Sequence, residues 1–127
     1  MEYAALIILF ALLQFLLFGV RVGVNRGKYG IKAPATTGNE IWERMYRVQM
    51  NTMEQLVIFV PAVIAFSVYV SNRWVLLPGL LFLVGRQLYS WEYVKDPDSR
   101  VPGMGISLLC NAALVIGALI GLLMVVI

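Results

Sequence analysis

The chain has 127 residues, of which 61% are hydrophobic and only 13% are charged. A water-soluble domain of this size exposes much of its surface and needs more charged residues. The composition therefore excludes a soluble globular domain and predicts a single integral membrane domain over residues 1–127. The net charge is +3, but no basic stretch interleaves with exposed aromatic residues, so no nucleic-acid partner is expected.

The sequence contains no histidine and a single cysteine, Cys110. A disulfide within the chain is excluded, and we expect neither a His/Cys metal site nor a histidine-based nucleophilic triad. Arginine, tyrosine, carboxylate and backbone groups remain as the chemistry-bearing groups. Cys110 lies in an apolar run without a nearby positive charge, which predicts a packed, unreactive thiol.

The apolar residues fall into four runs, which predict an all-α bundle of four transmembrane helices. A helix that spans a bilayer needs about 20 residues. The two middle runs are shorter than this, so each requires its polar flank to continue the helix. The predicted helices cover residues 3–26, 43–70, 74–95 and 103–127.

The first run is predicted to be a helix of the protein and not a cleaved signal, because it lacks a basic n-region and a clear cleavage site. Nine of the ten basic residues flank the first and third connections, and only Arg73 belongs to the second. Basic residues favour the cytoplasmic side of a membrane. We therefore expect the first and third connections to be cytoplasmic, with both termini on the opposite side.

Several polar and small residues are predicted to shape the bundle. Gln14 in the first helix and Asn111 in the fourth are expected to form hydrogen bonds between helices. A small-xxx-small series in the fourth helix allows close packing and comprises Ala113, Gly117 and Gly121. Asn39, in the loop before the second helix, is a predicted N-cap.

A ladder of polar residues opens the second helix. Its members recur at i, i+4, i+8 and i+11 and fall within roughly an 80° arc. They are Glu43, Arg47, Asn51 and Glu54. Ionisable side chains at the mouth of a membrane segment are costly and are usually kept for a substrate, an ion or each other. The ladder therefore predicts a recognition surface for a zwitterion. The alternative is a salt-bridge ladder within the helix, in which Glu43 pairs with Arg47, and Arg47 and Glu54 satisfy neighbouring groups.

A second polar stripe occupies one face of the third helix and consists of Arg86, Tyr89 and Tyr93. The alternative for the tyrosines is an aromatic belt at the membrane boundary. Arg100 follows a tight turn and precedes the fourth helix, where it could be a charge that only sets topology. A guanidinium close to a helix N-terminus also favours an anion, and a thiol near both ionises more readily than a free thiol.

Together these residues resemble a known family, the membrane-associated proteins in eicosanoid and glutathione metabolism (MAPEG). The likeness is strongest to the branch of leukotriene C4 synthase and microsomal glutathione transferase, and it covers nearly the whole chain. The motifs that carry it are Thr36-Thr37-Gly38, Glu43-Arg44-x-Tyr46-Arg47-x-Gln49-x-Asn51-x-x-Glu54, Arg86-x-x-Tyr89-x-x-x-Tyr93 and Arg100.

The resemblance implies a homotrimer that binds glutathione as co-substrate at each subunit interface, near the cytosolic face. Arg100 matches the arginine that stabilises the glutathione thiolate and is the implied catalytic residue. The implied glutathione contacts are Arg26, Arg47, Asn51, Glu54 and Tyr93, with Gln49, Arg86 and Tyr89 in support. Two positions depart from the leukotriene synthase pattern, namely Gln55 in place of a tyrosine and Gly27 in place of a second arginine.

The resulting hypothesis is a glutathione transferase or peroxidase that acts on lipophilic electrophiles or hydroperoxides from the bilayer. A non-catalytic lipid-binding scaffold, similar to five-lipoxygenase-activating protein on the same fold, is the alternative. A small four-helix drug exporter is a third option. Such a transporter needs an acidic residue deep in a helix. Between residues 3 and 20 the first helix has no acidic residue, and its only candidate polar group there is the amide of Gln14.

Overall fold

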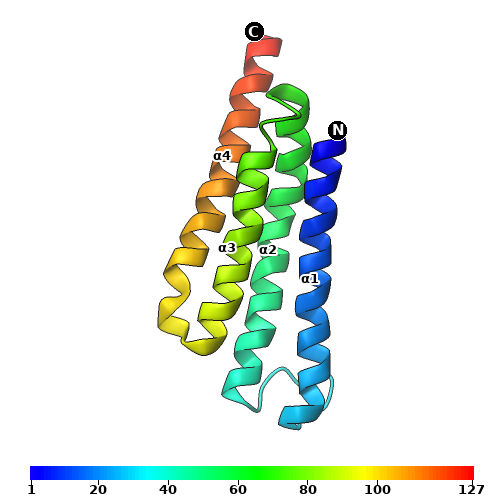
Figure 1. The fold of residues 1–127 in the computed structure, drawn as a ribbon, viewed down its shortest axis with the longest axis vertical. Coiled ribbons are helices and arrows are strands. Elements are labelled where there is room, and N and C mark those ends of the chain that lie inside the picture. Colours follow the sequence, from blue (N-terminus) through cyan, green and yellow to red (C-terminus); the bar gives the residue numbers. More distant parts are fainter.

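Four long helices run up and down side by side in the computed structural model of the protein (Figure 1). They are α1 (Glu2–Tyr29), α2 (Glu40–Tyr69), α3 (Leu76–Lys95) and α4 (Val101–Val126), and a short 3₁₀ helix, η1 (Pro97–Arg100), joins the last two. The structure describes the backbone of the whole chain and every side chain except those of Ser99 and Arg100. The predicted four-helix all-α architecture is therefore confirmed.

Three helices among the described residues are long and apolar enough to cross a membrane, namely α1, α2 and α4. Their outward faces carry many exposed leucine, isoleucine and valine side chains, which water would not tolerate at this density. The third helix, α3, has 20 residues and changes from apolar at its start to polar after Gly85. The protein is thus an integral membrane protein. The second half of α3 places polar side chains inside the bundle.

The two termini lie at one end of the bundle (Figure 1). The loop between α1 and α2 and the 3₁₀ helix η1 lie together at the other end, which we call the loop end. The polar half of α3 and the first half of α2 meet there. The sequence ladder and the tyrosine stripe are therefore neighbours in space.

Helix α2 begins at Glu40, three residues before the predicted start, because Asn39 caps it. The Asn39 side-chain oxygen accepts a hydrogen bond from the Trp42 backbone N–H at 3.1 Å, and Glu43 accepts one from the Gly38 N–H, also at 3.1 Å. The third helix ends at Lys95 as predicted, and the other helix boundaries differ from prediction by one to three residues, as is usual at helix ends. The predicted cap is confirmed.

Replacing Asn39 by alanine is expected to destabilise the protein by about 1 kcal/mol, the usual cost of losing an N-cap side chain. Thermal unfolding in detergent would measure this loss. Asn39→Asp keeps an acceptor oxygen at the same place and should retain wild-type stability. Equal unfolding temperatures for the alanine variant and the wild type would rule out the capping contribution.

The helices are joined by an apolar core and by hydrogen bonds from side chains of one helix to another. Phe59 of α2 and Phe82 of α3 stack with ring centroids 3.9 Å apart. Gln14 donates to the Leu83 carbonyl at 3.0 Å, and Asn111 donates to the side chain of Gln55 at 2.8 Å. The predicted hydrogen bonds between helices are therefore confirmed.

Glycines let α4 approach two other helices at the level of the backbone. A Cβ added at Gly103 would lie 2.5 Å from the backbone nitrogen of Tyr89 in α3. At the far end of α4, a Cβ added at Gly121 would collide with the carbonyl oxygen of Tyr69 in α2. Helix α4 is thus held against α3 by its first turn and against α2 near its end.

Candidate functional site

Arg86 is the centre of the polar network at the loop end. Only 1% of the residue is exposed. Its Nε donates to the Ser107 hydroxyl of α4 at 2.8 Å, and its Nη1 donates to the Asn51 side-chain oxygen at 2.6 Å and to the Thr52 hydroxyl at 3.4 Å. One guanidinium therefore connects α2, α3 and α4.

The guanidinium of Arg86 has aromatic rather than acidic neighbours. It lies 4.6 Å from the centroid of the Tyr89 ring, and Tyr89 stacks on Tyr93 with centroids 5.2 Å apart. Over the described residues, Arg86 forms no ion pair with a carboxylate. Hydrogen bonds and the tyrosine face thus offset the cost of burying this charge.

A polar pocket of about 390 Å³ opens beside Tyr93 at the loop end. Helix α2 supplies most of its wall, and Arg44 closes it toward α3 by donating to the Val94 carbonyl at 3.2 Å. Both signs of charge are present, so the pocket suits a zwitterionic ligand. Its lining residues are Thr36, Glu40, Glu43, Arg44, Tyr46, Arg47, Tyr93 and Pro97.

A second cavity of about 390 Å³ lies between α2, α3 and α4, and we call it the amide cavity. Its polar part consists of Asn51, Gln55 and Arg86. The rest of its wall comes from the first two turns of α4 and is apolar apart from backbone, with Val101, Met104, Gly105 and Leu108. The cavity therefore combines hydrogen-bonding groups with space for an apolar group.

Arg47 and Glu54 of the predicted ladder form an ion pair at 3.0 Å, and their side chains are 50% and 54% exposed. An ion pair within the helix does form, as in the salt-bridge alternative, but it joins Arg47 to Glu54, two turns after it, and not to Glu43, one turn before it. An ion pair this exposed contributes little to stability, about 0–1 kcal/mol. Both groups are therefore available to a ligand at small cost.

Among the predicted site residues with described side chains, four line neither cavity, namely Arg26, Gln49, Glu54 and Tyr89. Glu54 and Tyr89 pair with the cavity residues Arg47 and Arg86, whereas Arg26 and Gln49 have other partners. Arg26 donates to the Ala35 carbonyl at 2.8 Å and lies 4.7 Å from the centroid of the Trp42 ring. Gln49 packs its side-chain amide against Gly19 of α1. Within one chain, neither residue lines the polar pocket beside Tyr93 or the amide cavity beside Asn51 and Arg86.

The side chain of Arg100, the predicted catalytic residue, lies outside the part of the chain whose side chains are described. Its backbone ends η1 and directly precedes Val101, which lines the amide cavity. The predicted placement of Arg100 before the fourth helix is thus consistent with the described backbone.

Thr52 and Ser107 were not anticipated from the sequence, although both bind the guanidinium of Arg86. Ser107 also donates to the Gly103 carbonyl at 2.9 Å, so its oxygen is left to accept from Arg86. The only feature of the sequence that could have pointed to these residues is a hydroxyl side chain in or next to an apolar run. It does not reveal its partner, because the partner depends on how α3 and α4 cross.

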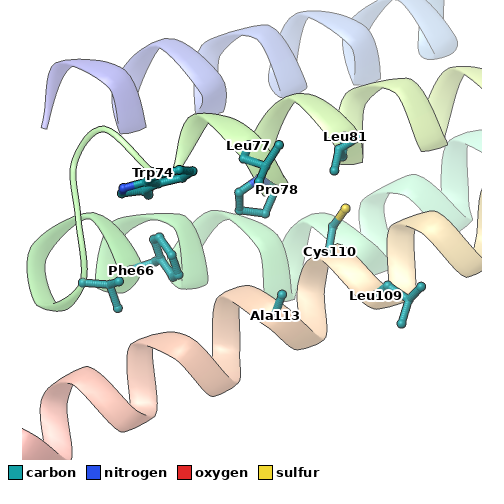
Figure 2. A pocket seen from close by; sticks show the side chains of 9 residues that line it. Phe66, Trp74, Leu77, Pro78, Leu81, Leu109, Cys110 and Ala113 are labelled. Atoms are coloured by element: carbon teal, nitrogen blue, oxygen red, sulfur yellow. The ribbon is translucent and has the colours of Figure 1, made fainter.

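An apolar groove of about 460 Å³ lies nearer the other end of the bundle (Figure 2). Side chains of α2, α3 and α4 form it, and Cys110 lies in its wall, packed as predicted (Figure 2). The groove is lined by Phe66, Val70, Trp74, Leu77, Pro78, Leu81, Leu109, Cys110 and Ala113. None of the predicted site residues contributes to it, so we assign it no part in the candidate site.

The fold and these cavities define a membrane-embedded helical bundle with cationic and amide groups gathered at one end. The sequence model of the MAPEG family matches residues 3–120. The chain belongs to the MAPEG family, and the resemblance found in its motifs is confirmed.

Individual relatives are consistent with this membership. The uncharacterized protein sll1147 of Synechocystis is 40% identical over 121 residues, which cover 95% of this chain and 88% of that protein. Human microsomal glutathione S-transferase 2 is 34% identical over 91 residues, covering 72% of this chain and 62% of its own length. Guinea pig (Cavia porcellus) leukotriene C4 synthase is 31% identical over 84 residues, covering 66% and 56% respectively. A relative named for glutathione transfer and one named for leukotriene C4 synthesis thus share part of this sequence, and the chain spans less than two thirds of the length of each.

Proposed function

We propose that the protein is a membrane-embedded glutathione transferase or peroxidase that attacks lipophilic electrophiles or hydroperoxides. The observation that carries the proposal is a continuous series of contacts at the loop end. It runs from Tyr93 in the polar pocket through Tyr89 and Arg86 to Asn51 in the amide cavity. Glutathione carries two carboxylates, an ammonium group and a thiol. The guanidinium, amide and phenol groups of this series complement the carboxylates, and the Glu43 and Glu54 carboxylates at the same end of the bundle complement the ammonium group.

In this proposal the charged side chains of the polar pocket and the Arg47–Glu54 pair hold the peptide, and Arg100 acts on its sulfur. Arg47 and Glu54 form an exposed ion pair that a zwitterion can replace, and Tyr93 lies in the pocket beside Arg47. Arg100, whose backbone adjoins the amide cavity, would stabilise the thiolate. The thiolate is the nucleophile, so a higher thiolate fraction raises the rate.

The electrophile would enter the amide cavity from the bilayer. The wall formed by Val101, Met104 and Leu108 is apolar and offers no competing hydrogen-bonding side chain. A lipophilic compound held there would face the glutathione sulfur. Because both reactants would be bound in one site, the reaction would become effectively unimolecular. This apolar wall supports the proposed class of lipophilic substrates.

The proposed assembly is a homotrimer with glutathione between protomers. Arg26 and Gln49, which the family resemblance implies as glutathione contacts, line neither cavity of their own chain. A neighbouring protomer would bring its Arg26 and Gln49 to the exposed face of Arg47 and Glu54. We further propose that the loop end faces the cytoplasm, because it carries most of the basic residues.

Glutathione is expected to raise the thermal unfolding temperature of the purified protein in detergent. A ligand at a hundred times its Kd stabilises the folded state by about 2.7 kcal/mol. The protein should also conjugate a generic aryl halide to glutathione. S-methylglutathione, which cannot form a thiolate, should stabilise the protein without supporting the reaction. Absence of both effects would contradict the proposal, while stabilisation without turnover would favour a scaffold protein.

A further inference from the structure

The orientation of the Asn51 amide is fixed by the chemistry of its neighbour. A guanidinium has five N–H donors and no acceptor. Only the Asn51 oxygen can therefore face the Nη1 of Arg86, 2.6 Å away. The amide nitrogen of Asn51 must point elsewhere, and no described residue accepts a hydrogen bond from it. Since Asn51 lines the amide cavity, its N–H groups are available there as donors.

Gln55, one helical turn after Asn51, is held in the same manner. Asn111 of α4 donates from Nδ2 to the Gln55 side-chain oxygen at 2.8 Å and to the Gln55 backbone carbonyl at 3.4 Å. The side-chain oxygen of Gln55 thus already accepts a hydrogen bond from within the protein, as that of Asn51 does. Its amide nitrogen, too, makes no hydrogen bond within the described part of the chain.

We propose that Arg86 and Asn111 are positioning residues that turn both cavity amides so that only donors face the ligand. The amide cavity then selects a group rich in hydrogen-bond acceptors, namely a carboxylate or peptide carbonyl oxygen of the bound tripeptide. This inference rests on the proposed function, because it assigns the chemistry that the cavity recognises in glutathione. Arg86 borders the cavity, but it is only 1% exposed and its guanidinium is engaged by Ser107, Asn51 and Thr52, so we assign it the positioning of Asn51.

Asn51→Asp tests the proposal, because aspartate has the shape of asparagine and still accepts from Arg86, but donates nothing. We expect the unfolding temperature to remain at or above that of the wild type, since the new carboxylate pairs with the buried guanidinium. The Kd and KM for glutathione should rise by about tenfold to a hundredfold, while kcat at saturating glutathione changes little. Isothermal titration and steady-state kinetics provide the two readouts.

Thr52→Val is the matched control. Thr52 also accepts from Nη1 of Arg86, at 3.4 Å, but it is fully buried and does not line the cavity. This variant should lower the unfolding temperature and leave the glutathione Kd unchanged. If Arg86 had a purely structural role, Asn51→Asp would instead bind glutathione as tightly as Thr52→Val and the wild type.

Gln55→Glu provides a second, independent variant, because Asn111 can still donate to the glutamate oxygen. It should also weaken glutathione binding by about tenfold or more. If the wild type binds glutathione and both carboxylate variants bind within twofold of it, the positioning inference is wrong and the proposed function stands. If the wild type itself fails to bind glutathione, both fall.

Discussion

Arg100→Ala is expected to lower the conjugation turnover at pH 7 by about a hundredfold to a thousandfold, the usual effect of removing one electrostatic stabiliser of a reacting anion. The proposed role of Arg100 is to keep the glutathione sulfur ionised, so glutathione binding should persist. Titration of glutathione into the variant measures the binding, and turnover of an aryl halide measures the reaction.

The pH profile distinguishes this role from a general loss of structure. A free thiol has a pKa of about 8.5, so without the guanidinium the thiolate fraction rises about tenfold per pH unit below that value. The Arg100→Ala variant should therefore recover activity as the pH rises toward 8.5, whereas the wild type should change less. Lys95→Ala, an exposed cation at the end of α3, is the control and should match the wild type. Unchanged turnover at pH 7 in the Arg100 variant would exclude the assigned role.

Gly103→Ala is expected to destabilise the protein by about 1–3 kcal/mol, as overpacking in a close-packed interior does. The added methyl would lie 2.5 Å from the Tyr89 backbone nitrogen and 2.8 Å from the Gly85 carbonyl oxygen. These are backbone atoms of α3, which cannot rotate away as a side chain can. The two helices must separate, and the Arg86–Ser107 hydrogen bond lengthens with them. Thermal or denaturant unfolding in detergent would measure the loss.

Gly105→Ala makes the same chemical change two residues further along α4, where an added Cβ meets nothing within 4 Å. Its stability without ligand should equal that of the wild type or rise by up to about 1 kcal/mol, because alanine favours helix over glycine. Equal stability of the Gly103 and Gly105 variants would contradict the close approach of α3 and α4.

The four helices could be predicted because an apolar run in a bilayer permits few other structures, and a polar flank extends each of the two shorter runs to spanning length. Their ends could not, since a cap or a tight connection decides them. Asn39 was identified as a cap, yet the second helix was predicted to start at residue 43, where the polar ladder begins. The structure starts it at Glu40, directly after that cap.

The candidate site was predictable to the extent that it follows helical periodicity. The spacing of Arg86, Tyr89 and Tyr93 predicted one face, and these side chains do stack in order. Contacts between helices could not be obtained in this way. The pairing of Arg86 with Ser107 depends on where α4 crosses α3, and no local pattern encodes that crossing. The roles proposed for the site residues remain predictions for the experiments above.

Helix α4 touches backbone at two places, Gly103 against α3 and Gly121 against α2. About 27 Å separate these points along a straight helix, which behaves as a nearly stiff rod over this length. A side chain introduced at Gly121 would push one end of the rod outward and tilt the other. This tilt of α4 would displace Val101 and the Arg100 backbone, although the substituted residue lies near the opposite membrane surface. Substitutions remote from the loop end can therefore alter the shape of the amide cavity without touching it.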